Sequence, residues 1–213
     1  MSPTSSSRRE LLRYKPFDRM LHWLVAVGFI LAGLSGLAFF HPSFFFLTNL
    51  FGGGGWTRIL HPFVGVVMFA FFLVLVLRFL RDNLPAAADA QWFSQLGAIV
   101  GNRERPSADV GKYNGGQKLV FWVMVLSLLA LVVTGVVLWR PYFAPQFTVD
   151  ILRLAVVVHA VSAFVALLAA VVHVYAAIWV KGTVRAMTRG TVSHKWAAHH
   201  HPAWYRKVTG SRT

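Results

Sequence analysis

Four histidines lie in or at the start of long apolar stretches of the sequence: His22, His61, His159 and His173. The stretch VVVHAVSAFVALLAAVVHVY, residues 156–175, holds two of them, 14 residues apart. An imidazole can ligate a metal ion or carry a proton. Because an unpaired polar group in hydrocarbon is costly, each of these imidazoles is expected to have a partner.

The sequence contains no cysteine. This excludes iron–sulfur ligation by the chain itself, a thiolate-bound haem, covalent haem attachment through C-x-x-C-H, and disulfides. Any redox cofactor is therefore expected to be held non-covalently by other ligands.

The elements that position the histidines are predicted to be membrane-spanning helices. Of the 213 residues, 56% are hydrophobic and 13% are charged, about half the charged share of a soluble domain. A membrane helix needs about 20 mostly apolar residues, and four stretches qualify, at approximately 19–40, 59–80, 117–139 and 151–180. We expect an all-α fold: a four-helix transmembrane bundle in a single integral membrane domain, 1–213, with a basic tail at 181–213. The long connection between the second and third spans contains QWFSQLGAIV, which predicts a short interfacial helix.

The basic residues predict the orientation of the spans. A net charge of +14 would suggest nucleic acid in a soluble protein, but here the lysines and arginines flank apolar spans. Eighteen fall on one side: Arg8, Arg9, Arg13, Lys15, Arg19, Arg78, Arg81, Arg103, Arg105, Lys112, Lys118, Lys181, Arg185, Arg189, Lys195, Arg206, Lys207 and Arg212. Three fall on the other: Arg58, Arg140 and Arg153. The positive-inside rule then places both termini in the cytoplasm, with the first apolar stretch retained as a helix.

With this topology the four histidines form two pairs by depth. His61 and His159 begin spans on the outer side, whereas His22 lies near the cytoplasmic start of the first span. Fourteen residues of helix place His173 about 21 Å further in than His159 and within roughly 40° of the same face. Two imidazoles from facing helices can bind one haem iron, so the pairs predict an outer haem (His61, His159) and an inner haem (His22, His173).

Two other interpretations apply to these histidines. A hydroxyl or a backbone carbonyl can satisfy a buried imidazole without any cofactor. A proton relay would usually bring membrane aspartate or glutamate, and no acidic residue lies within the four spans apart from Asp18 at the entrance. This absence favours the haem interpretation.

Small residues and further histidines give weaker signals. Gly28, Ala32 and Gly36 recur every four residues, as expected for close helix packing, for room beside a bulky ring, or for both. His41 is expected to be interfacial and structural. The tail histidines are expected to be solvated or docked on a partner rather than to bind metal: His194, His199, His200 and His201.

Several stretches resemble one family closely: FDRMLHW, RILHPFVG, DVGKYNGGQK, VTGVVLWRPYFA, WVKG and HHPAWYR, together with the paired histidines of the fourth span. Over residues 14–206 the chain resembles the cytochrome b, or gamma, subunit of membrane-bound quinone-dependent formate dehydrogenases. The helix-and-histidine pattern alone is also shared with cytochrome b subunits of nickel–iron hydrogenases and related reductases.

The resemblance implies two haem b groups, ligated by the histidine pairs given above, and a quinone site beside the inner haem. Asn114, Gly116, Gln117 and His173 match that quinone site. From the residues alone, YNGGQ is a polar turn whose amides can hydrogen-bond a quinone carbonyl and whose glycines allow close approach, or it is a plain loop and helix start.

The resemblance also implies a function and partners. In the bacterial inner membrane, a periplasmic iron–sulfur beta subunit would pass electrons to the outer haem, then to the inner haem and on to menaquinone or ubiquinone near the cytoplasmic face. Formate would be oxidised in a catalytic alpha subunit with a molybdenum- or tungsten-type cofactor, so no catalytic residue for that step is expected in this chain, and no nucleic-acid partner. The alternatives are the cytochrome b subunit of a hydrogenase or other oxidoreductase, and a haem-free transporter with a histidine relay.

Overall fold

The computed structural model describes residues 10–101 and 109–210 of the chain. Five of the cations used for the orientation prediction lie outside the described residues: Arg8, Arg9, Arg103, Arg105 and Arg212. The described chain is mostly helical, and four of its helices are long and apolar enough to cross a membrane.

The four long helices are α1 (Pro16–Phe40), α2 (Gly54–Phe79), α5 (Gly115–Val137) and α6 (Val149–Trp179). All four predicted spans are confirmed as helices, and each helix begins two to five residues earlier than predicted. In α2 the early start has a visible cause, because the Thr57 hydroxyl donates to Gly53 O at 2.9 Å and closes the first turn. Pro62 lies inside α2.

Shorter elements connect the spans. They are β1 (Leu11–Leu12), η1 (Pro42–Phe51), η2 (Arg81–Asn83), α3 (Ala87–Ser94), α4 (Leu96–Val100), η3 (Ala144–Gln146), α7 (Thr183–Arg189), β2 (Thr191–Val192), α8 (His194–His200) and α9 (Pro202–Thr209). The short helix predicted at 91–100 is observed as two helices, α3 and α4, separated at Gln95, and its interfacial position stays a prediction. His41 is structural, as expected, since its Nδ1 accepts the Ser43 N–H and caps η1.

The chain divides into two compact units. The first, which we call the tail unit, comprises Met1–Arg19, Phe79–Phe121 and His173–Thr213. The second, the bundle unit, comprises Met20–Arg78 and Trp122–Val172. The expectation of one membrane domain over 1–213 stays a prediction.

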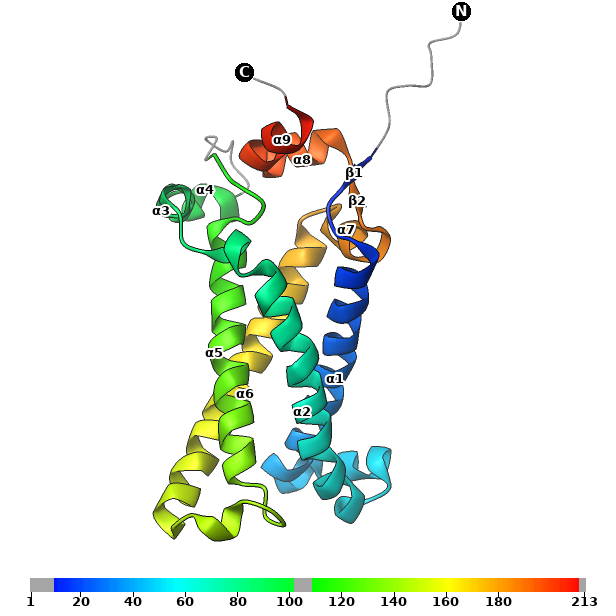
Figure 1. Cartoon of the computed structure of the whole chain (residues 1–213), viewed down its shortest axis with the longest axis vertical. Helices are drawn as coiled ribbons and strands as arrows, with labels where there is room; N and C mark the ends of the chain where they lie inside the picture. Colours follow the sequence, from blue (N-terminus) through cyan, green and yellow to red (C-terminus); the bar gives the residue numbers. More distant parts are fainter. Residues whose placement is uncertain (1–9, 102–108, 211–213) are drawn as a thin grey trace, which may run out of the picture. The chain divides into compact units, whose positions relative to one another are not determined.

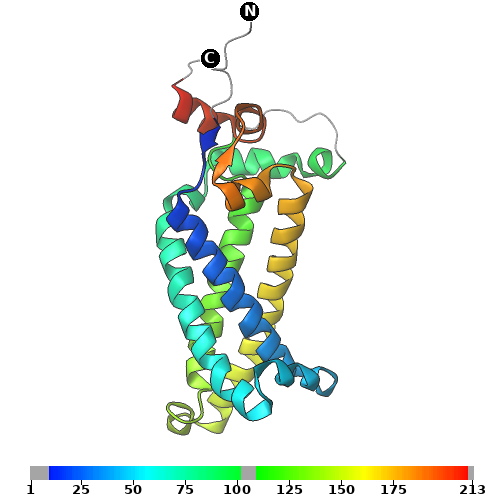
Figure 2. The same cartoon turned by 90° about the vertical axis from the view of Figure 1, so that its right-hand side faces the viewer.

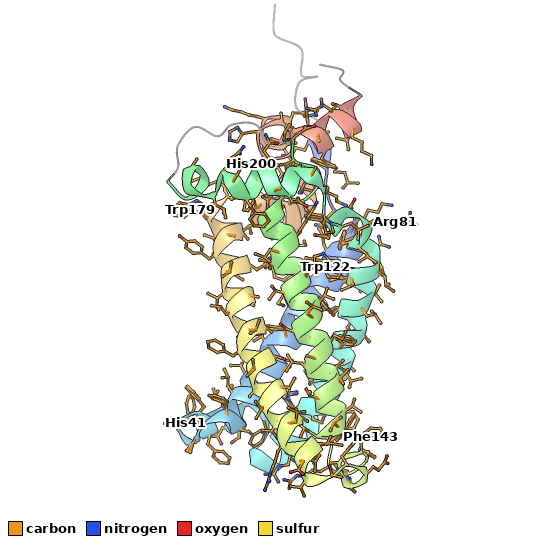
Figure 3. All side chains as sticks on the ribbon, turned by 90° about the vertical axis from the view of Figure 1, so that its left-hand side faces the viewer. His41, Arg81, Trp122, Phe143, Trp179 and His200 are labelled. Atoms are coloured by element: carbon orange, nitrogen blue, oxygen red, sulfur yellow. The ribbon has the colours of Figure 1, made fainter. Side chains whose placement is uncertain are left out.

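In the bundle unit, parts of α1, α2, α5 and α6 run side by side (Figure 1). Its core consists of Met68, Leu128 and Ala166 with flanking apolar side chains. A Cβ atom on Gly28 would lie 2.8 Å from Cβ of Met68, so this glycine serves the close approach of α1 and α2. Figure 3 shows His41 and Phe143 at the same end of this unit, which fits their placement in connections on one side of the membrane.

In the tail unit, β1 and β2 form an antiparallel pair in which Leu11 faces Val192 (Figure 2). Its core contains Ala186, Val192, Ala197 and Trp204. Gly190 links α7 to β2 with φ +86°, and a Cβ atom there would lie 2.8 Å from Tyr14 O. Only glycine fits this left-handed position and close approach, and its carbonyl accepts the N–H groups of Arg13 and Tyr14.

Candidate haem-binding and quinone-binding sites

The imidazoles of His61 and His159 lie together in the bundle unit, one on α2 and one on α6. Their ring centres are 6.3 Å apart and the ring planes make an angle of 67°. Helix α2 carries His61 in its second turn and α6 carries His159 in its third, so both rings project from near the starts of their helices. These are the two residues that the sequence predicted to form the outer pair.

Ser35 of α1 fixes the tautomer of His61. Its Oγ lies 2.8 Å from Nδ1 of His61 and donates its own proton to the carbonyl of Leu31 at 2.8 Å or Ala32 at 3.0 Å. A hydroxyl has one proton. Because that proton is used within α1, the oxygen accepts Nδ1–H from the imidazole, and the lone pair of His61 is on Nε2.

Thr134 of α5 makes the same arrangement with His159. Its Oγ1 lies 2.8 Å from Nδ1 of His159 and donates to Ala130 O at 2.6 Å. The lone pair of His159 is therefore also on Nε2. Metal-ligating histidines usually hydrogen-bond through the other ring nitrogen, which orients the ring and raises its basicity.

A glycine follows each of these hydroxyl residues and lies against the same imidazole. A Cβ atom on Gly36 would be 3.3 Å from Cε1 of His61, and one on Gly135 would be 3.4 Å from Cε1 of His159. Of the small residues in the first span, Gly28 therefore serves helix packing and Gly36 makes room for an imidazole. The packing alternative for that motif is confirmed at Gly28, and room beside a haem ring stays a prediction.

The chemistry of this pair fits the protein ligands of a haem iron. The ring centres are 6.3 Å apart, near enough for both imidazoles to ligate one metal ion. Two neutral imidazoles with free Nε2 lone pairs, held by hydroxyls and surrounded by apolar helices, form a donor set suited to a haem iron.

The predicted inner pair is divided between the two units. His22 of α1 belongs to the bundle unit, where its ring contacts Trp23 with centres 5.3 Å apart. His173 of α6 belongs to the tail unit. The pairing of His22 with His173 stays a prediction.

The four residues matched to a quinone site all belong to the tail unit. Asn114 and Gln117 form a reciprocal cap at the start of α5. Gln117 N–H donates to Oδ1 of Asn114 at 2.9 Å, and Asn114 N–H donates to Oε1 of Gln117 at 3.0 Å. Each of the two side-chain carbonyl oxygens thus accepts one hydrogen bond within this cap.

Gly116 has a packing role that the sequence did not indicate. A Cβ atom there would lie 2.6 Å from Cη2 of Trp92, and one on Gly115 would lie 3.0 Å from Phe93. The two glycines therefore let the aromatic side chains of α3 pack on the first turn of α5.

Comparison with known proteins identifies the family. Residues 13–190 match the family model described as prokaryotic cytochrome b561. The chain belongs to the prokaryotic cytochrome b561 family. It is therefore a multi-pass membrane cytochrome b, and cytochromes b carry haem b.

Curated relatives of this cytochrome b cover nearly its whole length. It is 46% identical to the formate dehydrogenase cytochrome b556(fdo) subunit of Escherichia coli K12 over 201 residues, 94% of each chain. It is 40% identical to the nitrate-inducible formate dehydrogenase cytochrome b556(Fdn) subunit of the same organism, over 95% of this chain and 94% of the relative. The formate dehydrogenase cytochrome b556 subunit of Haemophilus influenzae is 38% identical, over 97% and 87%. The resemblance predicted from the sequence is confirmed.

The basic tail of this cytochrome b differs from the expectation in one respect. His201 is 1% exposed, so the expectation that the tail histidines are solvated is wrong for this residue. Pro202 begins α9, and Trp204 of this helix lies in the core of the tail unit, 8% exposed. No group of three or more His, Cys, Asp or Glu side chains suited to a metal ion occurs among residues 10–101 and 109–210.

Sequence reasoning missed Ser35, Thr134 and Gly135 as neighbours of the outer pair. The sequence did contain a pattern that could have indicated them. A hydroxyl residue followed by glycine occurs in both the first span (Ser35, Gly36) and the third span (Thr134, Gly135). It also counted Arg13 only as a topology charge, whereas this side chain is 6% exposed.

Proposed function

We propose that this chain is the membrane cytochrome b subunit of a formate dehydrogenase and that it delivers electrons to a quinone. The names of the relatives at 38–46% identity support the formate dehydrogenase assignment. The observation that carries the electron-transfer role is the pair His61 and His159. Each uses Nδ1 to hydrogen-bond a hydroxyl, so Nε2 would be the iron ligand, and the ring centres are 6.3 Å apart.

Two haem b groups would be held by this chain. His61 and His159 would ligate the outer one, and His22 and His173 the inner one. When bound, each haem would supply a one-electron carrier. The apolar side chains of α1, α2, α5 and α6 would exclude water from them, which limits loss of electrons to side reactions.

Electrons would enter from an iron–sulfur beta subunit, since this chain contains no cysteine to hold a cluster of its own. A catalytic alpha subunit with a molybdenum- or tungsten-type cofactor would oxidise formate. Both partners would lie on the periplasmic side, next to the outer haem. The chain would cross the bacterial inner membrane with both termini in the cytoplasm, as the distribution of its lysines and arginines predicts.

Quinone would bind in the tail unit at Asn114, Gly116, Gln117 and His173. The NH2 groups of Asn114 and Gln117 would donate to a quinone carbonyl, because their oxygens already cap α5. Reduction of a quinone to a quinol takes two electrons and two protons, and the protons would come from the cytoplasm. This uptake would complete one arm of a redox loop.

A haem count tests the proposal. The purified complex, assayed as pyridine haemochrome, is expected to contain two haem b per copy of this chain, and His61→Ala or His159→Ala is expected to leave one. His173→Ala should lose the inner haem and quinone reduction while keeping the outer haem. Absence of haem from an intact complex, or two haems with full quinone reduction in His173→Ala, contradicts the assignment.

A further inference from the structure

An irregular segment of the tail unit, residues 109–113, precedes the turn that carries Asn114 and Gln117. Three successive carbonyls of this segment accept hydrogen bonds from groups far away in the sequence. The donors are Ala203 N–H to Val110 O at 3.1 Å, His201 Nδ1–H to Gly111 O at 2.8 Å, and Arg13 Nη2 to Lys112 O at 2.5 Å. The N-terminal segment and the C-terminal tail thus fix the backbone that leads into the quinone turn.

His201 uses both ring nitrogens in this arrangement. Nδ1–H donates to Gly111 O, and Nε2 accepts from Nη2 of Arg13 at 3.2 Å. Only the neutral Nδ1–H tautomer can do both. Burial, together with the Arg13 guanidinium, lowers the pKa of His201 to about 3. The ring is therefore neutral throughout the physiological pH range, and the hydrogen-bond pattern does not change within it.

Arg13 is held by aromatic rings as well as by hydrogen bonds. The guanidinium carbon lies 4.8 Å from the ring centre of Trp204 and 5.1 Å from that of Trp196. It also lies 5.9 Å from the ring centre of Tyr113, the residue directly before Asn114. A guanidinium is attracted to the faces of aromatic rings, so these rings and the hydrogen bonds together hold the buried Arg13 in one place.

The tail unit also has an apolar core, and Trp204, which Arg13 contacts, is one of its residues. Ala186, Val192, Ala197 and Trp204 pack together, and β1 pairs with β2. Loss of the His201 or Arg13 hydrogen bonds should therefore leave the tail folded, while the backbone of residues 110–112 becomes less restrained. The Asp109–Arg206 ion pair is solvent-exposed and contributes little in its place.

We propose that Arg13 and His201 are positioning residues for the quinone site. They fix the carbonyls of Gly111 and Lys112 and thereby set where the amides of Asn114 and Gln117 stand. The inference rests on the proposed quinone site and adds to it two residues from opposite ends of the chain.

The variants follow from the geometry. His201→Ala and Arg13→Met remove the donors to Gly111 and Lys112. The amide nitrogen of asparagine can take the position of Nδ1, so His201→Asn should keep the bond to Gly111, whereas the longer His201→Gln should not. His199→Ala is the matched control, because His199 is an exposed histidine of the same run.

Two measurements on the purified complex test the proposal. Hydrogen–deuterium exchange of a peptide covering 109–117 reports on the segment itself. Steady-state kinetics with a short-chain soluble quinone separate KM from kcat. Loss of one buried hydrogen bond should raise the quinone KM about fivefold to tenfold, with haem content and kcat nearly unchanged and faster exchange of the peptide. His201→Asn should restore KM, and His199→Ala should match the wild type.

Three results would contradict the proposal. Unchanged exchange in both His201→Ala and Arg13→Met overturns the proposal. Faster exchange with an unchanged quinone KM also overturns it, provided that Asn114→Ala raises KM in the same assay. If Asn114→Ala and Gln117→Ala both leave quinone kinetics unchanged, the quinone site is wrong and this inference is wrong with it, while the haem count still tests the rest of the proposed function.

Discussion

Ser35 accepts the Nδ1–H of His61 across the interface between α1 and α2, with 2.8 Å between the two atoms. Thr134 and His159 repeat this relationship between α5 and α6. The two hydroxyls give the outer pair its tautomers without a charged partner, which suits a site inside hydrocarbon, where a carboxylate would be costly.

Removal of either hydroxyl should change the potential of the outer haem. In Ser35→Ala or Thr134→Ala the imidazole loses an acceptor for Nδ1–H and becomes a weaker donor to ferric iron, so the midpoint potential should rise. A hydrogen bond of about 1 kcal/mol corresponds to a few tens of millivolts, since about 59 mV is a factor of ten for one electron. Potentiometric titration of the haem spectrum measures the shift.

Ser127→Ala is the control for that prediction. Ser127 is a buried serine of α5, and among the described residues it makes no hydrogen bond to His61 or His159. Equal potentials in wild type, Ser35→Ala and Thr134→Ala would show that these hydroxyls do not act on the iron ligands.

Bulk at Gly36 or Gly135 should displace the imidazoles. Because a Cβ atom would already lie 3.3 or 3.4 Å from Cε1 of the adjacent histidine, the longer side chain in Gly36→Leu or Gly135→Leu should push the ring away and lose the outer haem. Gly65→Leu on α2 is the control, since a Cβ atom there meets nothing within 4 Å. Full haem content in Gly36→Leu would refute the predicted site.

The two roles of Asn114 can be separated by substitution. Asn114→Asp keeps an oxygen that accepts the Gln117 N–H and thus preserves the cap, but it has no NH2 group for a quinone. We expect unchanged thermal stability and a raised quinone KM. Asn114→Ala should also lose about 1 kcal/mol of stability, the usual contribution of an N-cap. A normal KM in Asn114→Asp would mean that the amide donor is not used.

Acid should destabilise the tail unit through His201. The pKa of this histidine is lowered from 6.5 to about 3 by burial and by Arg13, with a smaller contribution from His200. At pH values between about 3 and 6.5, His201 is protonated in the unfolded chain and neutral in the folded chain. Stability is therefore complete above about pH 6.5 and falls toward pH 3 by about 1.4 kcal/mol for each pH unit.

Hydrogen exchange of the tail peptides between pH 7 and pH 4, corrected for the intrinsic rate, measures this effect. In His201→Gln the neutral amide removes this titration, so the pH dependence should become shallower than in the wild type. Equal slopes in the two proteins would contradict the assignment of the effect to His201.

The sequence alone determined the four spans, the four histidines in them and the family. Long apolar runs have one stable form in a membrane, the helix, because each backbone N–H and C=O must be satisfied within the segment. Each residue of a helix advances the chain by a fixed rise, so residue numbers also predicted that His61 and His159 lie at the same depth in the membrane.

Tertiary structure alone decided which side chains surround those histidines. The bond from Ser35 to His61 joins residues 26 apart, and that from Arg13 to His201 joins residues 188 apart. Such contacts depend on the rotation and packing of helices, which small residues such as Gly28 and Gly36 set. The burial of His201 next to the exposed His199 also depends on tertiary packing, because its two hydrogen-bond partners, Gly111 and Arg13, lie 90 and 188 residues away in the sequence.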